Sequence, residues 1–362
     1  MNESLSLRLD TLRIVGAMMV FAAHASYLGY TGSSAGFAHH YGHTGVIVFF
    51  VLSGYVIAFV SDTKHTDLPH YSVARFARLY SVLLPALILT PLLDLAGRAM
   101  DPEVYRSISD EQPVFRVIAN ATFMQQSNHL FVKYFSNGPM WSIGYEFWYY
   151  AIYGIFVYLR GTRRILFGVI AFVFAGYKVL LLMPVWLIGV AIYRLHARGV
   201  TMPQSLQRAL IFFFAAMFLM MVEFGLFHQQ MSELNYLVTS PLGGRGLGFS
   251  QWFVRDFFLG LVIGLLVLCM KGESPAGRWR SAPVARYIAG ATFSIYLFHV
   301  PLILFLQATG IFPADSWIGG LALAATALAC CFLLASLTER RLQPYKDFFR
   351  MLFQRLGWWR GS

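Results

Sequence analysis

The chain alternates between long apolar runs and short polar segments that are rich in arginine. An apolar run of roughly 20 residues is long enough to cross the hydrocarbon core of a bilayer as a helix. We therefore predict an all-α integral membrane protein with about ten transmembrane helices. Their expected ranges are 12–30, 44–61, 79–97, 141–158, 165–178, 180–195, 207–228, 251–270, 287–310 and 316–337. The boundary between the fifth and sixth spans, near Leu182 and Pro184, is the least defined, so nine or eleven spans also fit the pattern.

Composition supports a membrane protein, with 57% hydrophobic and only 12% charged residues, whereas soluble domains carry roughly a quarter charged residues. With the N-terminus inside, the alternating loops place 21 of the 28 lysines and arginines on the inner side. The positive-inside rule then predicts that both termini are cytoplasmic. This distribution accounts for the net charge of +11, so we expect no nucleic acid partner.

We divide the chain into a transmembrane domain, residues 1–338, and a basic aromatic tail, residues 339–362. The tail is expected to lie as an amphipathic helix on the lipids of the inner leaflet. The three cysteines lie in apolar segments and are expected to be core residues. Histidines at an interface rarely bind a metal without carboxylate or cysteine ligands beside them, so we expect no metal at His39, His40 and His43.

The first span carries two ionisable residues on one face. Arg13 and His24 are eleven residues apart, which on a helix returns to within roughly 20° of the same direction, about 16 Å further along the axis. Charged and polar side chains are costly inside a membrane and mark functional sites there. We therefore treat both residues as candidates.

Three further polar features lie at or within the predicted spans. Arg75 and Arg78, at the inner mouth of the third span, share a helix face. Glu146 enters the fourth span from the outer side and His299 enters the ninth from the inner side. Helical rise places His24, His299 and Glu146 in one layer of the membrane, outward of its midplane. A histidine near a carboxylate is suited to proton transfer, although each of these groups also fits a role in helix–helix hydrogen bonding.

Seven segments, taken in order, resemble the acyltransferase 3 family of multipass membrane acyltransferases, which includes bacterial O-acetyltransferases of surface polysaccharides. They are LRIVGAMMVFAAHASY at 12–27, GVIVFFVLSGYVI at 45–57, RFARLY at 75–80, WSIGYEFWYY at 141–150, LIGVAIYRL at 187–195, SIYLFHVP at 294–301, and the basic segment after Glu339. The resemblance implies functional roles for Arg13, His24, Arg75 and Arg78.

The resemblance also implies a reaction. The donor would be a cytoplasmic acyl-CoA, commonly acetyl-CoA, and the acceptor a glycan or lipid-linked saccharide hydroxyl at or beyond the outer face of a bacterial inner membrane. Arg75 and Arg78 can hold phosphate oxygens, with Arg13 just within. His24 would act as general base on the acceptor hydroxyl or as a nucleophile that forms an acyl-imidazole. Glu146 and His299 would orient this base or bind the acceptor.

The chain departs from the family pattern in two respects. Members often have an aspartate where this chain has Ile47, which we interpret as the mark of a subfamily. Some relatives continue into a soluble esterase-like domain, and no such domain follows the last predicted span. Two other functions fit the buried charges: a transporter or flippase for a lipid-linked sugar or anion, and a scaffold in which they only join helices. No inverted repeat of the kind common in transporters is visible.

Overall fold

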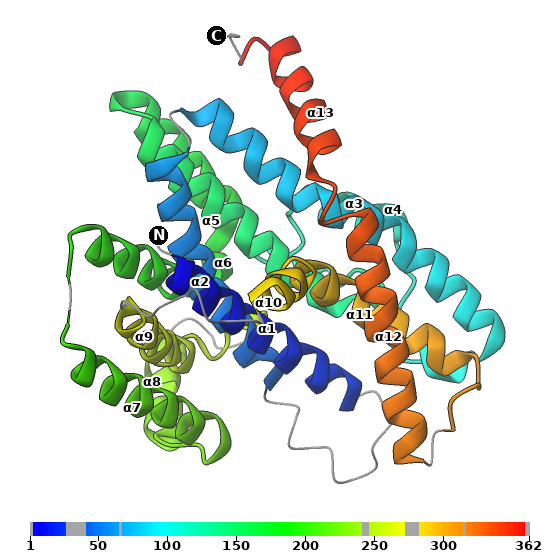
Figure 1. Ribbon diagram of the computed structural model, residues 1–362. Helices are drawn as coiled ribbons and strands as arrows, with labels where there is room; N and C mark the ends of the chain where they lie inside the picture. Colours follow the sequence, from blue (N-terminus) through cyan, green and yellow to red (C-terminus); the bar gives the residue numbers. More distant parts are fainter. Residues whose placement is uncertain are drawn as a thin grey trace.

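The computed structural model describes residues 3–26, 41–64, 67–200, 202–240, 246–271, 282–313 and 316–358. These residues form helices and no β-strand (Figure 1). The α-helices are α1 Glu3–Ala25, α2 Tyr41–Thr63, α3 Leu68–Met100, α4 Pro113–Ala121, α5 Trp141–Tyr158, α6 Gly161–Ala197, α7 Gln204–Glu223, α8 His228–Thr239, α9 Phe253–Cys269, α10 Ala282–Ala289, α11 Thr292–Ala308, α12 Trp317–Leu337 and α13 Leu342–Arg355. The prediction of an all-α protein is confirmed for this part of the chain.

Five helices within the described ranges are long and apolar enough to cross a membrane: α2, α3, α6, α7 and α12. A sixth candidate is the pair α10 and α11, which meet at an angle of 53°. Helices α1, α5 and α9 occupy segments where spans were expected, but α1 carries Arg8, Asp10 and Arg13, and α9 has only 17 residues. An integral membrane protein is thus supported by five or six spans rather than ten, and the orientation of the termini stays a prediction.

Two predicted boundaries are wrong by several residues. Helix α1 begins at Glu3, so Arg13 lies in its middle and His24 in its last turn. Helix α3 begins at Leu68, eleven residues before the predicted start of the third span, so Arg75 and Arg78 lie within its first three turns and share a helix as expected. The start of α3 is capped by Asp67, whose carboxylate accepts a hydrogen bond from the His70 amide at 2.9 Å, and caps of this kind stabilise the first turn of a helix.

Glycines bring α2 into close contact with two other helices. A β-carbon at Gly45 would lie only 2.6 Å from the carbonyl oxygen of Gly16 on α1. At the crossing of α2 with α6, a β-carbon at Gly54 of α2 would overlap the carbonyl oxygen of Trp186, and one at Gly189 of α6 would overlap that of Val51. Small residues at such crossings allow the backbones of membrane helices to touch. Helix α2 is therefore fixed between α1 and α6.

Helix α6 covers both the fifth and the sixth predicted spans, and it is broken at Gly176 (φ 78°, ψ 166°) rather than near Pro184. Only glycine adopts this conformation readily. The break frees two carbonyl groups, which accept hydrogen bonds from the loop after α4: Ser127 Oγ donates to Phe174, and Asn128 Nδ2 donates to Val173 at 3.0 Å. The freed backbone groups of the break are thus satisfied by protein.

The predicted tail contains a helix, α13, that packs against protein. Its Phe349 and Phe353 are buried against Val73, Phe76 and Ala77 of α3, and in Figure 1 α13 (red) extends from one end of the bundle near the start of α3. The opposite face of α13 leaves Phe348 and Met351 exposed. An amphipathic helix does form here, and its contact with lipid stays a prediction.

Several sequence features lie outside the described residues. They are His39 and His40, four arginines of the charge count (Arg245, Arg278, Arg280 and Arg360), the end of the first predicted span and the last four residues of the tail.

Candidate functional site

A cavity of about 540 Å³ opens among α1, α2, α3, α5, α10, α11 and the segment after α12. We call it the charged pocket, because six cationic and three acidic side chains line it. The cations are Arg13, Lys64, Arg75, Arg78, Arg286 and Lys346, and the acids are Asp10, Glu146 and Glu339. Its volume is typical of small-molecule sites. Four of the six predicted site residues, Arg13, Arg75, Arg78 and Glu146, therefore share one cavity.

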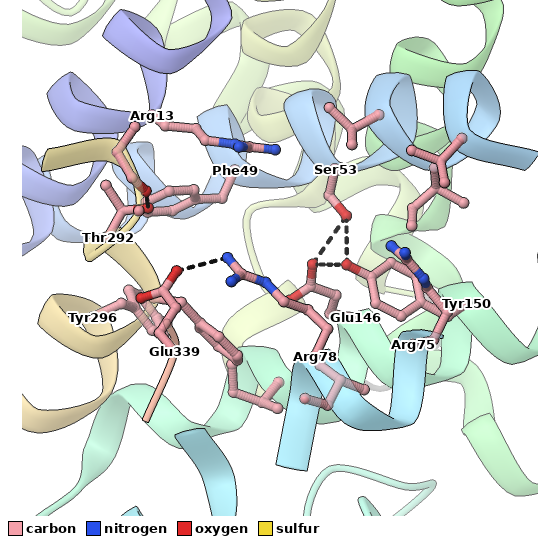
Figure 2. A pocket seen from close by; sticks show the side chains of 18 of the residues that line it. Arg13, Phe49, Ser53, Arg75, Arg78, Glu146, Tyr150, Thr292, Tyr296 and Glu339 are labelled. Atoms are coloured by element: carbon pink, nitrogen blue, oxygen red, sulfur yellow. Dashed lines mark hydrogen bonds and ion pairs between the residues drawn. The ribbon is translucent and has the colours of Figure 1, made fainter. Parts of the chain in front are cut away.

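Arg78 is held by a buried carboxylate at one side of the charged pocket. One of its guanidinium nitrogens lies 2.7 Å from Oε1 of Glu339, whose side chain is 1% exposed. The other oxygen of Glu339 accepts hydrogen bonds from the amide and hydroxyl of Ser294, at 2.9 and 3.1 Å. Figure 2 shows this pair on the opposite side of the pocket from Tyr150. The ion pair and the hydrogen bonds of Ser294 together join α3, α11 and the segment that follows α12.

Arg75 lies one helical turn before Arg78 but has a different environment. Its guanidinium carbon lies 5.9 Å from the ring centroid of Tyr71 and 5.8 Å from that of Tyr150, which are cation–π distances. Within the described ranges it makes no ion pair, and its Nε is buried without a hydrogen-bond partner. An arginine with unsatisfied donors facing a cavity is suited to receive an anionic ligand.

Glu146 is held by hydroxyl groups. Ser53 Oγ donates to Glu146 Oε1 at 3.0 Å, and Tyr150 donates to the same oxygen from one turn further along α5. Trp186 Nε1 donates to Ser53 at 3.2 Å, which joins α6 to the network. Figure 2 shows Ser53, Glu146 and Tyr150 as a triangle of hydrogen bonds on one wall. The Ser53 hydroxyl is thus engaged with a carboxylate.

Arg13 faces the same cavity from the middle of α1 (Figure 2). Its guanidinium lies 3.6 Å from Asp10, one turn earlier on α1. Because both residues line the pocket, they contribute no net charge to it, and its positive character comes from the other cations.

His24 and His299 lie next to each other, with ring centroids 4.9 Å apart and nearly perpendicular planes. In both rings Nδ1 donates to the carbonyl four residues earlier, at 2.9 Å. In a neutral imidazole this makes Nε2 the nitrogen that carries the lone pair in the ring plane. His299 is fully buried, and within the described ranges its Nε2 has no hydrogen-bond partner. The expectation that these two residues share one depth is confirmed.

The histidine pair does not belong to the described lining of the charged pocket. Tyr296 connects the histidine pair to the pocket, because it lines the pocket and its ring centroid lies 6.4 Å from that of His299. The hydroxyl of Tyr296 donates to the Pro139 carbonyl at 2.9 Å, and its ring contacts Phe49, with centroids 5.9 Å apart. Glu146 is bonded to Ser53 and Tyr150 rather than to a histidine, so the structure separates the carboxylate from the imidazole pair. The chemical roles of all six residues stay predictions.

Two pocket residues escaped the sequence reasoning. Glu339 directly precedes Arg340 and Arg341 at the start of the basic run that follows α12, and that contrast was the available signal. Tyr150 stands four residues after Glu146, the spacing at which helical side chains meet. In the described part of the chain, no group of three or more histidine, cysteine or acidic residues is arranged to hold a metal ion.

Comparisons with known proteins agree with this arrangement. A family model described as an acyltransferase domain, that of the acyltransferase 3 family, matches residues 6–336. Searches among curated proteins and among solved structures found no significant match. The family match spans nearly the whole chain, including every predicted site residue and all the helices that form the charged pocket except the segment carrying Glu339 and Lys346. The chain belongs to the acyltransferase 3 family.

Proposed function

We propose that this protein transfers an acetyl group from cytoplasmic acetyl-CoA to a hydroxyl group of a glycan or lipid-linked saccharide at or beyond the outer face of a bacterial inner membrane. Membership in the acyltransferase 3 family makes it a membrane acyltransferase. The donor, the acceptor and the membrane are the parts that we add.

The charged pocket is the observation that supports an acyl-CoA donor. Six cations against three acids leave it positive, and the phosphates of coenzyme A require such a surface. Arg75 is the residue best placed to bind them, because its donors are not used by a carboxylate of the described chain. Arg78 is already paired with Glu339 and would shape the pocket as much as bind phosphate.

The thin pantetheine arm would extend from Arg75 along α2 towards His24. Phe49 and Tyr296 close this end of the pocket by ring contact, so the arm must displace them to bring its thioester to the histidine pair. Nε2 of His24 would then either take the proton of the acceptor hydroxyl, while the hydroxyl oxygen attacks the thioester carbon, or attack that carbon itself. In the first case the coenzyme A thiolate leaves and the ester of the acceptor is formed directly. In the second the thiolate leaves as an acyl-imidazole forms, and the acceptor hydroxyl then attacks this intermediate, so that the imidazole of His24 is released and the hydroxyl proton passes to the thiolate.

His299 would assist His24 through ring contact, and Glu146 would fix Tyr150 and Ser53 beside the donor. The alternative of a transporter for a lipid-linked sugar would use the same charges without consuming acyl-CoA. Family membership favours acyl transfer, and no contact in the described structure favours transport.

Acetyl-CoA binding and hydrolysis by purified protein in detergent tests the proposal. We expect the wild type to bind and slowly hydrolyse acetyl-CoA, His24→Ala to bind but not turn over, and Arg75→Ala to bind poorly. His70→Gln is the control, since His70 pairs with exposed Asp67 away from the pocket. A wild type that binds neither acetyl-CoA nor a longer acyl-CoA would refute the proposal and favour the transporter.

A further inference from the structure

A second cluster of polar groups lies outside the charged pocket, where the first turns of α2 and α9 meet. Nε2 of His43 lies 2.8 Å from Oδ2 of Asp256. The side chain of Asp256 is 1% exposed and that of His43 is 25% exposed. The imidazole therefore connects a buried carboxylate to the accessible surface.

Both groups retain capacity to accept hydrogen bonds. Because a carboxylate only accepts, Nε2 of His43 carries the hydrogen of their bond, and Nδ1 is left as the acceptor of the neutral ring. The other oxygen of Asp256, Oδ1, is buried and has no hydrogen-bond partner among the residues that the structure describes. Buried polar atoms without partners are rare in proteins, and each calls for a specific explanation. A ligand that supplies hydroxyl hydrogens would satisfy both atoms.

Aromatic rings extend from this pair to the surface. His43 stacks on Trp141, with centroids 5.9 Å apart and planes within 8°. Trp141 stacks on Phe249 at 4.2 Å, and Phe249 on Phe131 at 5.6 Å. Phe131 is 46% exposed. Trp141 itself is buried, so Phe131 is the exposed end of the stack. An exposed aromatic face that is continuous with hydrogen-bonding groups suits ligands that have both apolar and hydroxyl-bearing surfaces, which is the chemistry of a pyranose ring.

The position of this cluster fits the proposed reaction. It lies at the ends of α2 and α9 that the charge distribution assigns to the outer side of the membrane. It also adjoins the histidine pair, since a β-carbon at Gly42 would lie 3.7 Å from Cε1 of His24, and Gly42 directly precedes His43. A saccharide bound here would lie beside the first turn of α2, and His24 of α1 packs against a neighbouring face of that turn.

We infer that His43, Asp256 and the aromatic stack of Trp141, Phe249 and Phe131 form the binding site for the saccharide acceptor. Asp256 Oδ1 and His43 Nδ1 accept hydrogen bonds from two of its hydroxyls, and the stack contacts its apolar face. The inference rests on the proposed function, because it names the acceptor site of that reaction.

The test uses dodecyl β-D-maltoside as a membrane-anchored saccharide, diluted into micelles of lauryldimethylamine oxide, which has no sugar. Transfer of radiolabelled acetyl to the maltoside is measured against its mole fraction. Since hydrogen bonds to the site are lost, we expect Asp256→Asn and His43→Gln to raise the KM for maltoside roughly tenfold or more. Turnover at saturating maltoside and acetyl-CoA affinity should remain near wild type, as should both values for the control His70→Gln.

A wild-type KM in both variants, or a wild type that binds acetyl-CoA but does not acetylate maltoside, overturns the inference. Equal losses of donor affinity, turnover and thermal stability would show a purely structural role and overturn it as well. Failure of the proposed function itself looks different, because the wild type would not bind acetyl-CoA at all. In that case calorimetric titration with maltose still decides: the wild type must bind it, and Asp256→Asn must bind it more weakly.

Discussion

Arg75 and Arg78 are three positions apart on α3, yet substituting them should have opposite consequences for stability and for ligand binding. Arg78→Ala leaves Glu339, which is 1% exposed, without its counter-ion. Removing one partner of a buried ion pair costs about 3–5 kcal/mol. Since Ser294 continues to donate two hydrogen bonds to Glu339, and Arg78 itself is 32% exposed, we expect the lower end of that range, about 3 kcal/mol.

Arg75→Ala removes no ion pair from the described structure, only contacts with two tyrosine rings. Cation–π contacts contribute about 0.5–1 kcal/mol at accessible sites, so the free energy of unfolding should fall by no more than about 1 kcal/mol. Hydrogen bonds to charged groups are worth about 1.5–3 kcal/mol. Loss of the phosphate contact should therefore weaken acetyl-CoA binding roughly 10- to 150-fold.

The assays are equilibrium unfolding in SDS mixed micelles and calorimetric titration with acetyl-CoA. A double variant, Arg78→Met with Glu339→Gln, provides the control, because replacing both members of a buried pair is often neutral. It should recover most of the stability that Arg78→Ala loses. If the two single substitutions simply add in the double variant, the pair is not coupled and this reasoning is wrong. If Arg75→Ala binds acetyl-CoA like the wild type, Arg75 does not hold the donor.

Three further predictions concern other parts of the structure. His24→Ala should keep its affinity for acetyl-CoA but lower turnover by a factor of about 10²–10⁴. If titration with acetyl-CoA and the turnover assay show equal losses of affinity and turnover, His24 has no chemical role. Gly189→Ala should abolish the folded peak in size-exclusion chromatography, since the added methyl overlaps the Val51 carbonyl oxygen, whereas Gly138→Ala, with nothing within 4 Å, should not. Lys346→Ala should weaken acetyl-CoA binding several-fold at low salt, and the difference should shrink at high salt because ions screen the charge.

Local pattern was enough to predict most of the helices and four of the residues that line the charged pocket. Apolar run length identified α12 to within one residue and α2 to within three, and Arg13 and His24 lie on one helix as expected. The shared depth of His24 and His299 followed from helical rise alone, since a rigid rise per residue converts sequence position to height. Run length could not locate the starts of α1 and α3, because their polar first turns are stabilised by tertiary contacts rather than by lipid.

Contacts between side chains of distant segments could not be predicted from the sequence. Nothing in the chain links Glu339 to Arg78 or Asp256 to His43, because each pair depends on how helices cross. The same limit explains Glu146, which was expected beside the histidines but whose side chain bonds Ser53 and Tyr150 instead. The break in α6 lies at Gly176 rather than at the more conspicuous Pro184, since the loop after α4 satisfies the carbonyl groups freed there.

The charged pocket takes residues from widely separated parts of the chain, from Asp10 to Lys346. During synthesis the early helices enter the membrane long before the ribosome reaches Glu339. Until then Arg78 lacks its carboxylate, and the wall that Glu339 and Lys346 supply is absent. A chain terminated after α12 would insert most of its apolar helices and still have no finished cavity. Only chains whose translation has passed Lys346 can therefore form the complete charged pocket.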